Sequence, residues 1–156
     1  MNYKTNVIRL LEREKLKYQV YDYTDCGMVR GMEVATYLHK NPEQLFKTLV
    51  TIGKSKQYYV FLIPDGKELD LKKTADLVGE KSISMVKSSD LFSITGYFHG
   101  GCSPIGMKKI YLTFIDWSAR FFSIILLSGG RIGIELEMKP EDLQRLILIY
   151  FADLCN

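Results

Sequence analysis

The chain has 156 residues, of which 47% are hydrophobic and 25% charged, a balance typical of one globular domain spanning residues 1–156. Residues 1–6 lack the apolar core of a signal peptide, and the most apolar stretches, 121–127 and 143–154, fall short of the roughly 20 apolar residues that a membrane-spanning helix needs. A formal net charge of +3 permits an RNA or phosphate partner without requiring one.

The cysteine and histidine content argues against two classes of protein. Cys26, Cys102 and Cys155 are an odd number without paired spacing, so we expect a reducing cytoplasm and no disulfide framework. Only two histidines accompany them, and none of the spacings is that of a metal site. We therefore expect a cytoplasmic protein without a metal or other cofactor.

The first half of the chain predicts two helices and three strands. Apolar residues at helical spacing indicate the helices, and the second helix is expected to end at Asn41-Pro42 because proline cannot continue it. The turn Gly53–Lys56 between two apolar runs is typical of a β-hairpin. The predicted helices are Thr5–Lys15 and Met32–His39, and the predicted strands are Tyr18–Tyr23, Leu45–Ile52 and Tyr58–Pro64.

The second half predicts further helices alternating with strands. Asp70 and Gly79 suit the N-cap and the C′ position of one helix. Pro140 followed by two acidic residues indicates the first turn of a last helix. We expect this last helix to bury Leu143, Ile147, Tyr150, Phe151 and Leu154. The remaining elements are a helix at Ser89–Ile94 and strands at Ser82–Met85, Ile110–Asp116, Phe122–Leu127 and Gly133–Glu137.

Hairpin strands together with helix-separated strands argue against a purely parallel sheet. We expect an α+β fold with a curved or barrel-like, mixed and mostly antiparallel sheet and helices packed outside it.

Lys47 is a charged residue inside an apolar strand. In a strand it shares one face with Leu45 and Leu49. A buried ammonium is costly unless paired, so Lys47 should lie beside a carboxylate or the anion of a ligand. The alternative is a lysine on an exposed edge strand, where it opposes aggregation.

The segment Gly100–Gly106 contains three glycines in seven residues. Its successive backbone N–H groups at Gly100, Gly101 and Cys102 could form an anion-binding concavity or an oxyanion hole. The alternative is a tight connection that needs positive φ angles. Together with Lys47, this loop suggests a pocket for an anion or a polarised carbonyl.

Three motifs that suggest other chemistries are incomplete. Gly53-Lys54-Ser55 has Thr48 where a phosphate-binding loop requires glycine, and Ser103 has Ile105 where a nucleophile elbow requires glycine. Cys102 with His99 could be the nucleophile and base of a cysteine hydrolase, but no third group that would orient the base is evident.

Five groups of residues, in order along nearly the whole chain, carry a resemblance to a known family. They are Phe46-Lys47-Thr48-Leu49; Leu69–Lys73; Thr95-Gly96-Tyr97 running into Gly100–Lys109; Ser128-Gly129-Gly130 with Glu135; and Phe151-Ala152-Asp153. In this combination the sequence resembles the YbaK/EbsC family of aminoacyl-tRNA deacylases, free-standing relatives of the editing domain of bacterial prolyl-tRNA synthetase. The resemblance implies a curved mixed sheet and hydrolysis of the ester between a wrong amino acid and tRNA, most characteristically cysteine on the proline tRNA.

The resemblance also implies roles for individual residues. Lys47 matches a pocket lysine near the scissile ester, Tyr23 a pocket tyrosine, and Ser128 a serine near the terminal adenosine. Glu135 stands where the best-known members carry aspartate, so its pairing with Lys47 is open. The candidate catalytic residues are Lys47, Gly100 and Gly101, and the candidate substrate-binding residues are Tyr23, Thr48, Cys102, Ser103, Ser128, Gly129 and Glu135.

The implied partners are the 3′ end of aminoacyl-tRNA and, as a candidate, prolyl-tRNA synthetase. We expect weak, largely electrostatic tRNA recognition, because no basic tract or aromatic stacking array stands out. The sequence leaves open which amino acid is removed. The main alternative is a non-catalytic module that binds aminoacyl-adenosine or tRNA, and a turnover assay discriminates between the two.

Overall fold

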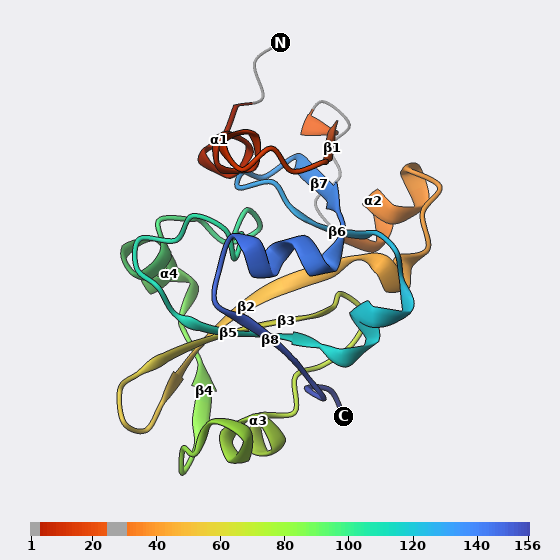
Figure 1. Cartoon of the computed structure of the whole chain (residues 1–156). Helices are drawn as coiled ribbons and strands as arrows, with labels where there is room; N and C mark the ends of the chain where they lie inside the picture. Colours follow the sequence, from red (N-terminus) through yellow and green to blue (C-terminus); the bar gives the residue numbers. More distant parts are fainter. Residues whose placement is uncertain (1–3, 25–30) are drawn as a thin grey trace.

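The structure is a computed structural model that describes residues 4–24 and 31–156. Its strands form two sheets, and short helices surround them (Figure 1). The α-helices are α1 (Asn6–Arg13), α2 (Gly31–Tyr37), α3 (Leu71–Val78) and α4 (Ser88–Thr95), and the 3₁₀ helices are η2 (Pro42–Gln44), η3 (Trp117–Phe121) and η4 (Pro140–Arg145). The strands are β1 (Gln19–Asp22), β2 (Phe46–Gly53), β3 (Tyr58–Pro64), β4 (Ile83–Met85), β5 (Leu112–Asp116), β6 (Ile125–Ser128), β7 (Ile134–Met138) and β8 (Ile149–Ala152).

The larger sheet is mixed and the smaller one is antiparallel. Five strands are ordered β4-β2-β3-β5-β8, and three strands are ordered β1-β7-β6. Within the described part of the chain, four of the six strand pairings are antiparallel, whereas β3–β5 and β5–β8 are parallel. A parallel bridge between Leu45 and Leu126 links the start of β2 to the smaller sheet. The predicted α+β class with a mostly antiparallel mixed sheet is confirmed.

Helix ends follow the local signals in the sequence. The Asp70 side chain accepts a hydrogen bond from the Lys73 N–H at the start of α3, and Gly79 ends that helix with φ +76°. At α1, the Thr5 side chain accepts from the Ile8 N–H in the same way. The caps at Asp70 and Gly79 lie where the sequence predicts them because they depend only on residues within one turn, whereas Thr5, predicted as the first residue of its helix, is the N-cap.

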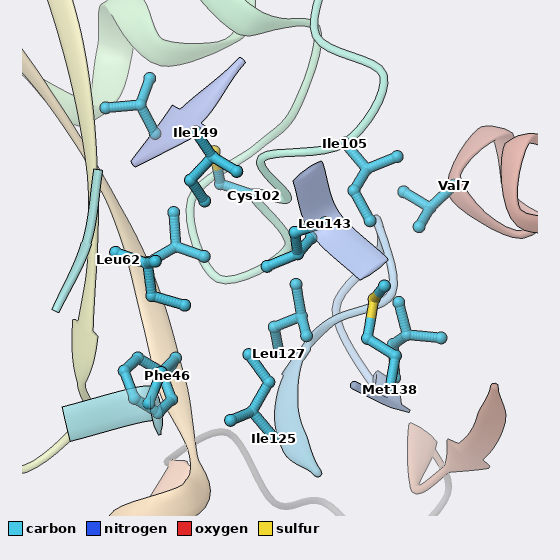
Figure 2. Packing of buried hydrophobic residues seen from close by; sticks show 14 of the residues in the cluster. Val7, Phe46, Leu62, Cys102, Ile105, Ile125, Leu127, Met138, Leu143 and Ile149 are labelled. Atoms are coloured by element: carbon cyan, nitrogen blue, oxygen red, sulfur yellow. The ribbon is translucent and has the colours of Figure 1, made fainter. Parts of the chain in front are cut away.

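The largest apolar cluster lies between the two sheets. It joins Val7 and Leu11 of α1 to residues of β2, β3, β6 and β7, and Figure 2 shows part of this packing. A second cluster, around Phe61 and Ile63, lies on the other face of the larger sheet. Alternate residues of β3 therefore face different clusters, which explains why the strand is apolar throughout.

The predicted last helix is wrong beyond its first turns. Pro140 does occupy the first helical position, but η4 ends at Arg145 and the chain continues as strand β8. β8 pairs in parallel with β5, with Thr113 opposite Ile149. Tyr150, predicted to be buried, is 50% exposed. The apolar and β-branched residues of β8 fit an edge strand. Its partner β5 lies more than thirty residues earlier in the chain, so a local sequence pattern does not reveal the pairing.

Two strands begin two or more residues later than the sequence predicts. β5 begins at Leu112, because Ile110 is exposed and unpaired with the sheet, and β6 begins only at Ile125. The 3₁₀ helix η3 occupies the connection between these two strands. Its N-cap, Asp116, accepts a hydrogen bond from the Ser118 N–H, so the turn begins directly at the end of β5.

Candidate functional site

A cavity of about 450 Å³ lies at the start of β2, where the two sheets meet. Its wall combines residues from β2, the chain after β3, the glycine loop, and strands β6 and β7. The lining residues are Tyr23, Leu45, Phe46, Lys47, Thr48, Leu49, Asp65, Leu91, His99, Gly100, Cys102, Ser128 and Glu135.

The β2 wall is fixed by the hairpin with β3. Lys47 pairs with Ile63 in the antiparallel register, and the Asp65 N–H donates to the Leu45 carbonyl over 2.8 Å. This last bond holds the Asp65 backbone, just beyond the end of β3, against the chain entering β2. A regular hairpin thereby brings an ammonium and a carboxylate to one cavity.

Two polar side chains of β2 have no protein partner in the described part of the chain. The Lys47 side chain is half-buried and makes no ion pair within 4.0 Å. The Thr48 Oγ1 atom is buried without a hydrogen-bond partner. Buried polar atoms are nearly always hydrogen-bonded, so a group left unpaired in a cavity wall is a place that a ligand can satisfy.

Glu135 is the most deeply buried carboxyl group of the wall. It belongs to β7, with Tyr21 of β1 and Ser128 of β6 as its neighbours in register, and it is 6% exposed. Burial, and then the negative charge of Asp65, raise the pKa of Glu135 to about 8. The carboxyl group is therefore mostly neutral at pH 7. Among the described residues it forms no ion pair with Lys47, so the pairing that the sequence left open is absent.

Tyr23 lies beside this carboxyl group. Its backbone N–H donates to the Gly133 carbonyl over 2.8 Å, which fixes the chain after β1 to the turn before β7. Burial, followed by the charge of Glu135, raises the pKa of Tyr23 to about 12. The phenol therefore stays protonated and can act as a hydrogen-bond donor.

The glycine loop needs two of its glycines for different reasons. Gly100 has φ +88°, which a larger residue rarely adopts. A Cβ atom on Gly101 would lie 2.8 Å from the backbone nitrogen of Ile132, so there is no space for a side chain at this position. The Gly101 N–H also donates to the Phe98 carbonyl over 3.0 Å, and Gly101 does not line the cavity.

The predicted row of three free amides is therefore incomplete. Gly101 uses its N–H inside a backbone turn, whereas the N–H groups of Gly100 and Cys102 make no hydrogen bond to any described residue. Only these two remain available to a ligand oxygen.

Cys102 is a core residue at the inner end of the loop. Its side chain is 8% exposed and belongs to the apolar cluster drawn in Figure 2 with Leu143 and Ile149. Burial raises the pKa of the Cys102 thiol to about 12, so the thiolate is scarce at neutral pH. No hydrogen bond joins it to His99, which lies exposed on the cavity wall, in the part of the chain that is described.

Ser103 and Gly129 lie off the cavity, and each has a local structural task. The Ser103 Oγ atom, fully buried, accepts from the Ile105 N–H over 3.1 Å. The Gly129 N–H donates to the Ile134 carbonyl over 2.9 Å, and a Cβ on Gly129 would lie 2.6 Å from the Ile134 Cγ2 atom. Both residues shape loops from which neighbouring residues reach the cavity.

The structure thus brings most of the predicted site residues to one cavity and adds others to them. Those that line it are Tyr23, Lys47, Thr48, Gly100, Cys102, Ser128 and Glu135. Asp65 and Leu91 were not predicted, although Asp65 follows Pro64 directly opposite Phe46 in the hairpin register, a relation the sequence contains. Over residues 4–24 and 31–156, no group of three or more metal-ligating side chains gathers, and no helix is long and apolar enough to cross a membrane.

The model of the aminoacyl-tRNA editing domain matches residues 30–146, and this segment contains every lining residue except Tyr23. The chain belongs to the aminoacyl-tRNA editing domain family. The recognised resemblance is therefore confirmed, and the activity of this family is aminoacyl-tRNA deacylation.

The chain is also similar to individual proteins, in sequence or in fold. The chain is 39% identical over 152 residues to EbsC of Enterococcus faecalis, a proposed Cys-tRNA(Pro)/Cys-tRNA(Cys) deacylase, covering 97% of this chain and 93% of EbsC. It is 22% identical over 152 residues to the proline–tRNA ligase of Thermosipho africanus, covering 92% of this chain but 26% of that ligase. A crystal structure of a proposed trans-editing enzyme for prolyl-tRNA synthetase superimposes with a TM-score of 0.84 at 23% identity, over 98% of this chain and 99% of that one.

Proposed function

We propose that this protein removes cysteine from mischarged proline tRNA by cleaving the aminoacyl ester in trans. The observation that supports it most strongly is the cavity at the start of β2, in which Lys47, Thr48 and Glu135 all lack protein partners among the described residues. The 39% identity to EbsC over nearly the whole chain supports the choice of amino acid and tRNA.

Each unpaired group receives a role toward the aminoacyl end of the tRNA. The Lys47 ammonium binds the substrate near the scissile ester, and the N–H groups of Gly100 and Cys102 face the ester oxygen as it gains negative charge. The Thr48 hydroxyl and the neutral Glu135 carboxyl donate hydrogen bonds to the aminoacyl group or the ribose. Ser128, which also lines the cavity, contacts the terminal adenosine.

The chemistry requires no nucleophile from the protein. The substrate's own thiol sulfur attacks the ester carbonyl carbon, the bond from that carbon to the ribose oxygen breaks, and the thiol proton passes to the departing ribose oxygen. The ester is already activated, so positioning and oxyanion stabilisation carry the reaction. A buried, protonated Cys102 thiol is compatible with this scheme and unsuited to a cysteine hydrolase.

The biological setting follows from the limits of binding selectivity. A synthetase that separates similar small amino acids by binding alone gains about 10- to 200-fold, so a second step that cleaves the wrong ester is useful. Within this proposal, residues 1–156 act as one editing domain in the cytoplasm, where aminoacyl-tRNA is used. Prolyl-tRNA synthetase is the candidate partner, because its own sequence contains a related segment.

The test is deacylation of proline tRNA charged with cysteine or with alanine by the purified protein. We expect rapid release of cysteine, with alanine spared, because alanine lacks the attacking thiol. Equal release of both amino acids would contradict the thiol mechanism and leave water as the nucleophile. Binding of aminoacyl-adenosine without any release would favour the non-catalytic module, for which the glutamate at position 135, where the best-known members carry aspartate, is the supporting observation.

A further inference from the structure

Two exposed phenylalanines stack on each other beside the glycine loop. Phe92 lies on α4 and Phe98 in the turn that follows it, and their ring centroids are 4.4 Å apart with planes inclined by 16°. Phe98 is 65% exposed and Phe92 is 44% exposed. Because Phe92 covers one face of the Phe98 ring, this exposure leaves the other face open to solvent.

The stack is held in place from both ends. The Lys108 Nζ atom lies 4.8 Å from the centroid of the Phe92 ring, and the Phe98 carbonyl accepts the Gly101 N–H over 3.0 Å. Single exposed apolar side chains are common and do not by themselves indicate a binding site. Phe121, for example, is 78% exposed and makes no ring contact with any described residue. Phe98 differs because its flat face is both exposed and fixed in orientation.

The stack adjoins the cavity. His99 and Gly100, the two residues after Phe98, line the cavity wall. The exposed side chain of Ile132 packs close to Gly100, and Arg131, also exposed, makes no ion pair within the described chain. The cavity rim therefore combines an aromatic face, an aliphatic side chain and positive charge.

We propose that the open face of Phe98 stacks on the base of the unpaired nucleotide that precedes the aminoacylated adenosine. Lys108 and Arg131 supply positive charge to the neighbouring phosphates. This inference deepens the proposed function and rests on it. Aromatic faces bind single-stranded bases with little sequence preference, and basic side chains beside them follow the backbone. The sequence alone does not reveal this pair, since it is the turn through Gly96 that brings together two rings six positions apart.

The experiment compares Phe98→Ala with the wild type on two substrates, cysteine-charged proline tRNA and cysteinyl-adenosine. For the tRNA we expect KM to rise by roughly 5- to 140-fold with kcat little changed, the range that the loss of one base stack gives. Cysteinyl-adenosine has no preceding nucleotide, so both proteins should act on it alike. Phe121→Ala is the matched control, an exposed phenylalanine without a stack, and should leave both substrates unaffected.

Conservative variants separate stacking from a structural role. Phe98→Tyr and Phe98→Trp keep a flat ring and should restore a KM near that of the wild type. Phe98→Leu keeps apolar bulk without the ring and should behave like Phe98→Ala. The unfolding temperatures of all variants should be close to that of the wild type, because the Phe98 ring is mostly in solvent.

Three outcomes would overturn the proposal. An unchanged KM of Phe98→Ala for the tRNA would show that no base stacks there, and would direct attention to a protein partner for this rim. An equal loss on tRNA and cysteinyl-adenosine would show that Phe98 shapes the cavity itself. Inactivity of the wild type on both substrates would refute the proposed deacylase function, and this inference with it, a result distinct from the first two.

Discussion

The two ends of β2 differ in how their polar side chains are satisfied. At the hairpin end, the Thr51 Oγ1 atom, fully buried, donates to the Tyr59 carbonyl over 2.9 Å, and the Glu80 carboxylate accepts from the Tyr59 hydroxyl over 2.6 Å. At the cavity end, the Thr48 Oγ1 atom and the Glu135 carboxyl group have no hydrogen-bond partner among the described residues. The polar network at one end of β2 is thus complete, and the one at its other end is incomplete.

This difference separates stability from function. Folding favours satisfied polar groups, and an unpaired buried group costs about 1–3 kcal/mol. A site that must bind a polar substrate keeps such groups unpaired until the substrate arrives. The hairpin end therefore provides a matched control, within the same strand and its neighbours, for every substitution at the cavity end.

The largest expected effect on the deacylation rate comes from replacing Lys47. Lys54, near the opposite end of the strand, is its control. Lys47→Ala should lower the single-turnover rate of deacylation by about 100- to 1000-fold, the cost of removing one charge-stabilising group from an active site. Lys54→Ala, in the exposed hairpin turn, should leave the rate unchanged. Both variants should unfold near the temperature of the wild type. Substantial turnover by Lys47→Ala would contradict the assignment of Lys47 to the substrate site.

Glu135 and Glu80 should give stability profiles of opposite sign. Burial raises the native pKa of Glu135 from the usual 4.5 to about 8, so the native state binds its proton more tightly than the unfolded state does. The free energy of unfolding should then fall as the pH rises between about 4.5 and about 8, by at most about 1.4 kcal/mol per pH unit. Glu135→Gln should flatten this decline, as measured by urea unfolding at several pH values.

The hydrogen bonds from Ser55 and Tyr59 lower the pKa of Glu80. Its carboxylate therefore stabilises the native state at neutral pH, and that contribution is lost as the pH falls through the lowered pKa. Glu80→Gln should lower stability at neutral pH and leave the decline caused by Glu135 in place. A wild-type profile that rises between pH 5 and pH 8 would contradict the assignment of Glu135 as a neutral acid.

The two threonines of β2 should respond oppositely to the same isosteric change. Thr51→Val removes a made hydrogen bond and should lower the free energy of unfolding by about 1 kcal/mol without affecting deacylation. Thr48→Val removes a hydroxyl that has no protein partner and should leave stability unchanged or raise it by about 1 kcal/mol, while slowing deacylation. Equal destabilisation of the two variants would mean that the Thr48 hydroxyl is satisfied in solution.

Among the cavity-lining residues substituted here, Cys102 should have the smallest effect on the deacylation rate. The thiol is protonated and packed in the core, so Cys102→Ala should change the deacylation rate by less than roughly threefold. Its cost should appear in thermal unfolding, because a buried side chain loses its packing. Complete inactivation of a folded Cys102→Ala variant would instead support a cysteine hydrolase.

The sequence predicts what depends on neighbouring residues and misses what depends on distant ones. The caps at Asp70 and Gly79 and the hairpin from Phe46 to Pro64 follow from local residue types, and the structure contains all of them. The strand β8 was mistaken for a helix because its pairing with β5 is a long-range contact. The periodic spacing of apolar residues alone does not reveal a distant partner strand.

The candidate site shows the same division. Lys47 is evident from sequence because a charge in an apolar strand is unusual. Asp65 and Leu91 were missed because only the tertiary fold brings them to the cavity. The use of the Gly101 N–H in a turn was likewise invisible, since a glycine-rich sequence does not show which amides are already bonded.

The most direct test of the difference between the two ends of β2 is amide chemical-shift mapping with an unreactive amide analogue of cysteinyl-adenosine. We predict shift changes at residues 47–49, 99–102, 128 and 135, with residues 51–57 of the hairpin end unaffected. Changes confined to other surfaces, with the amides at the cavity end unmoved, would contradict the claim that the unpaired groups there are the substrate site.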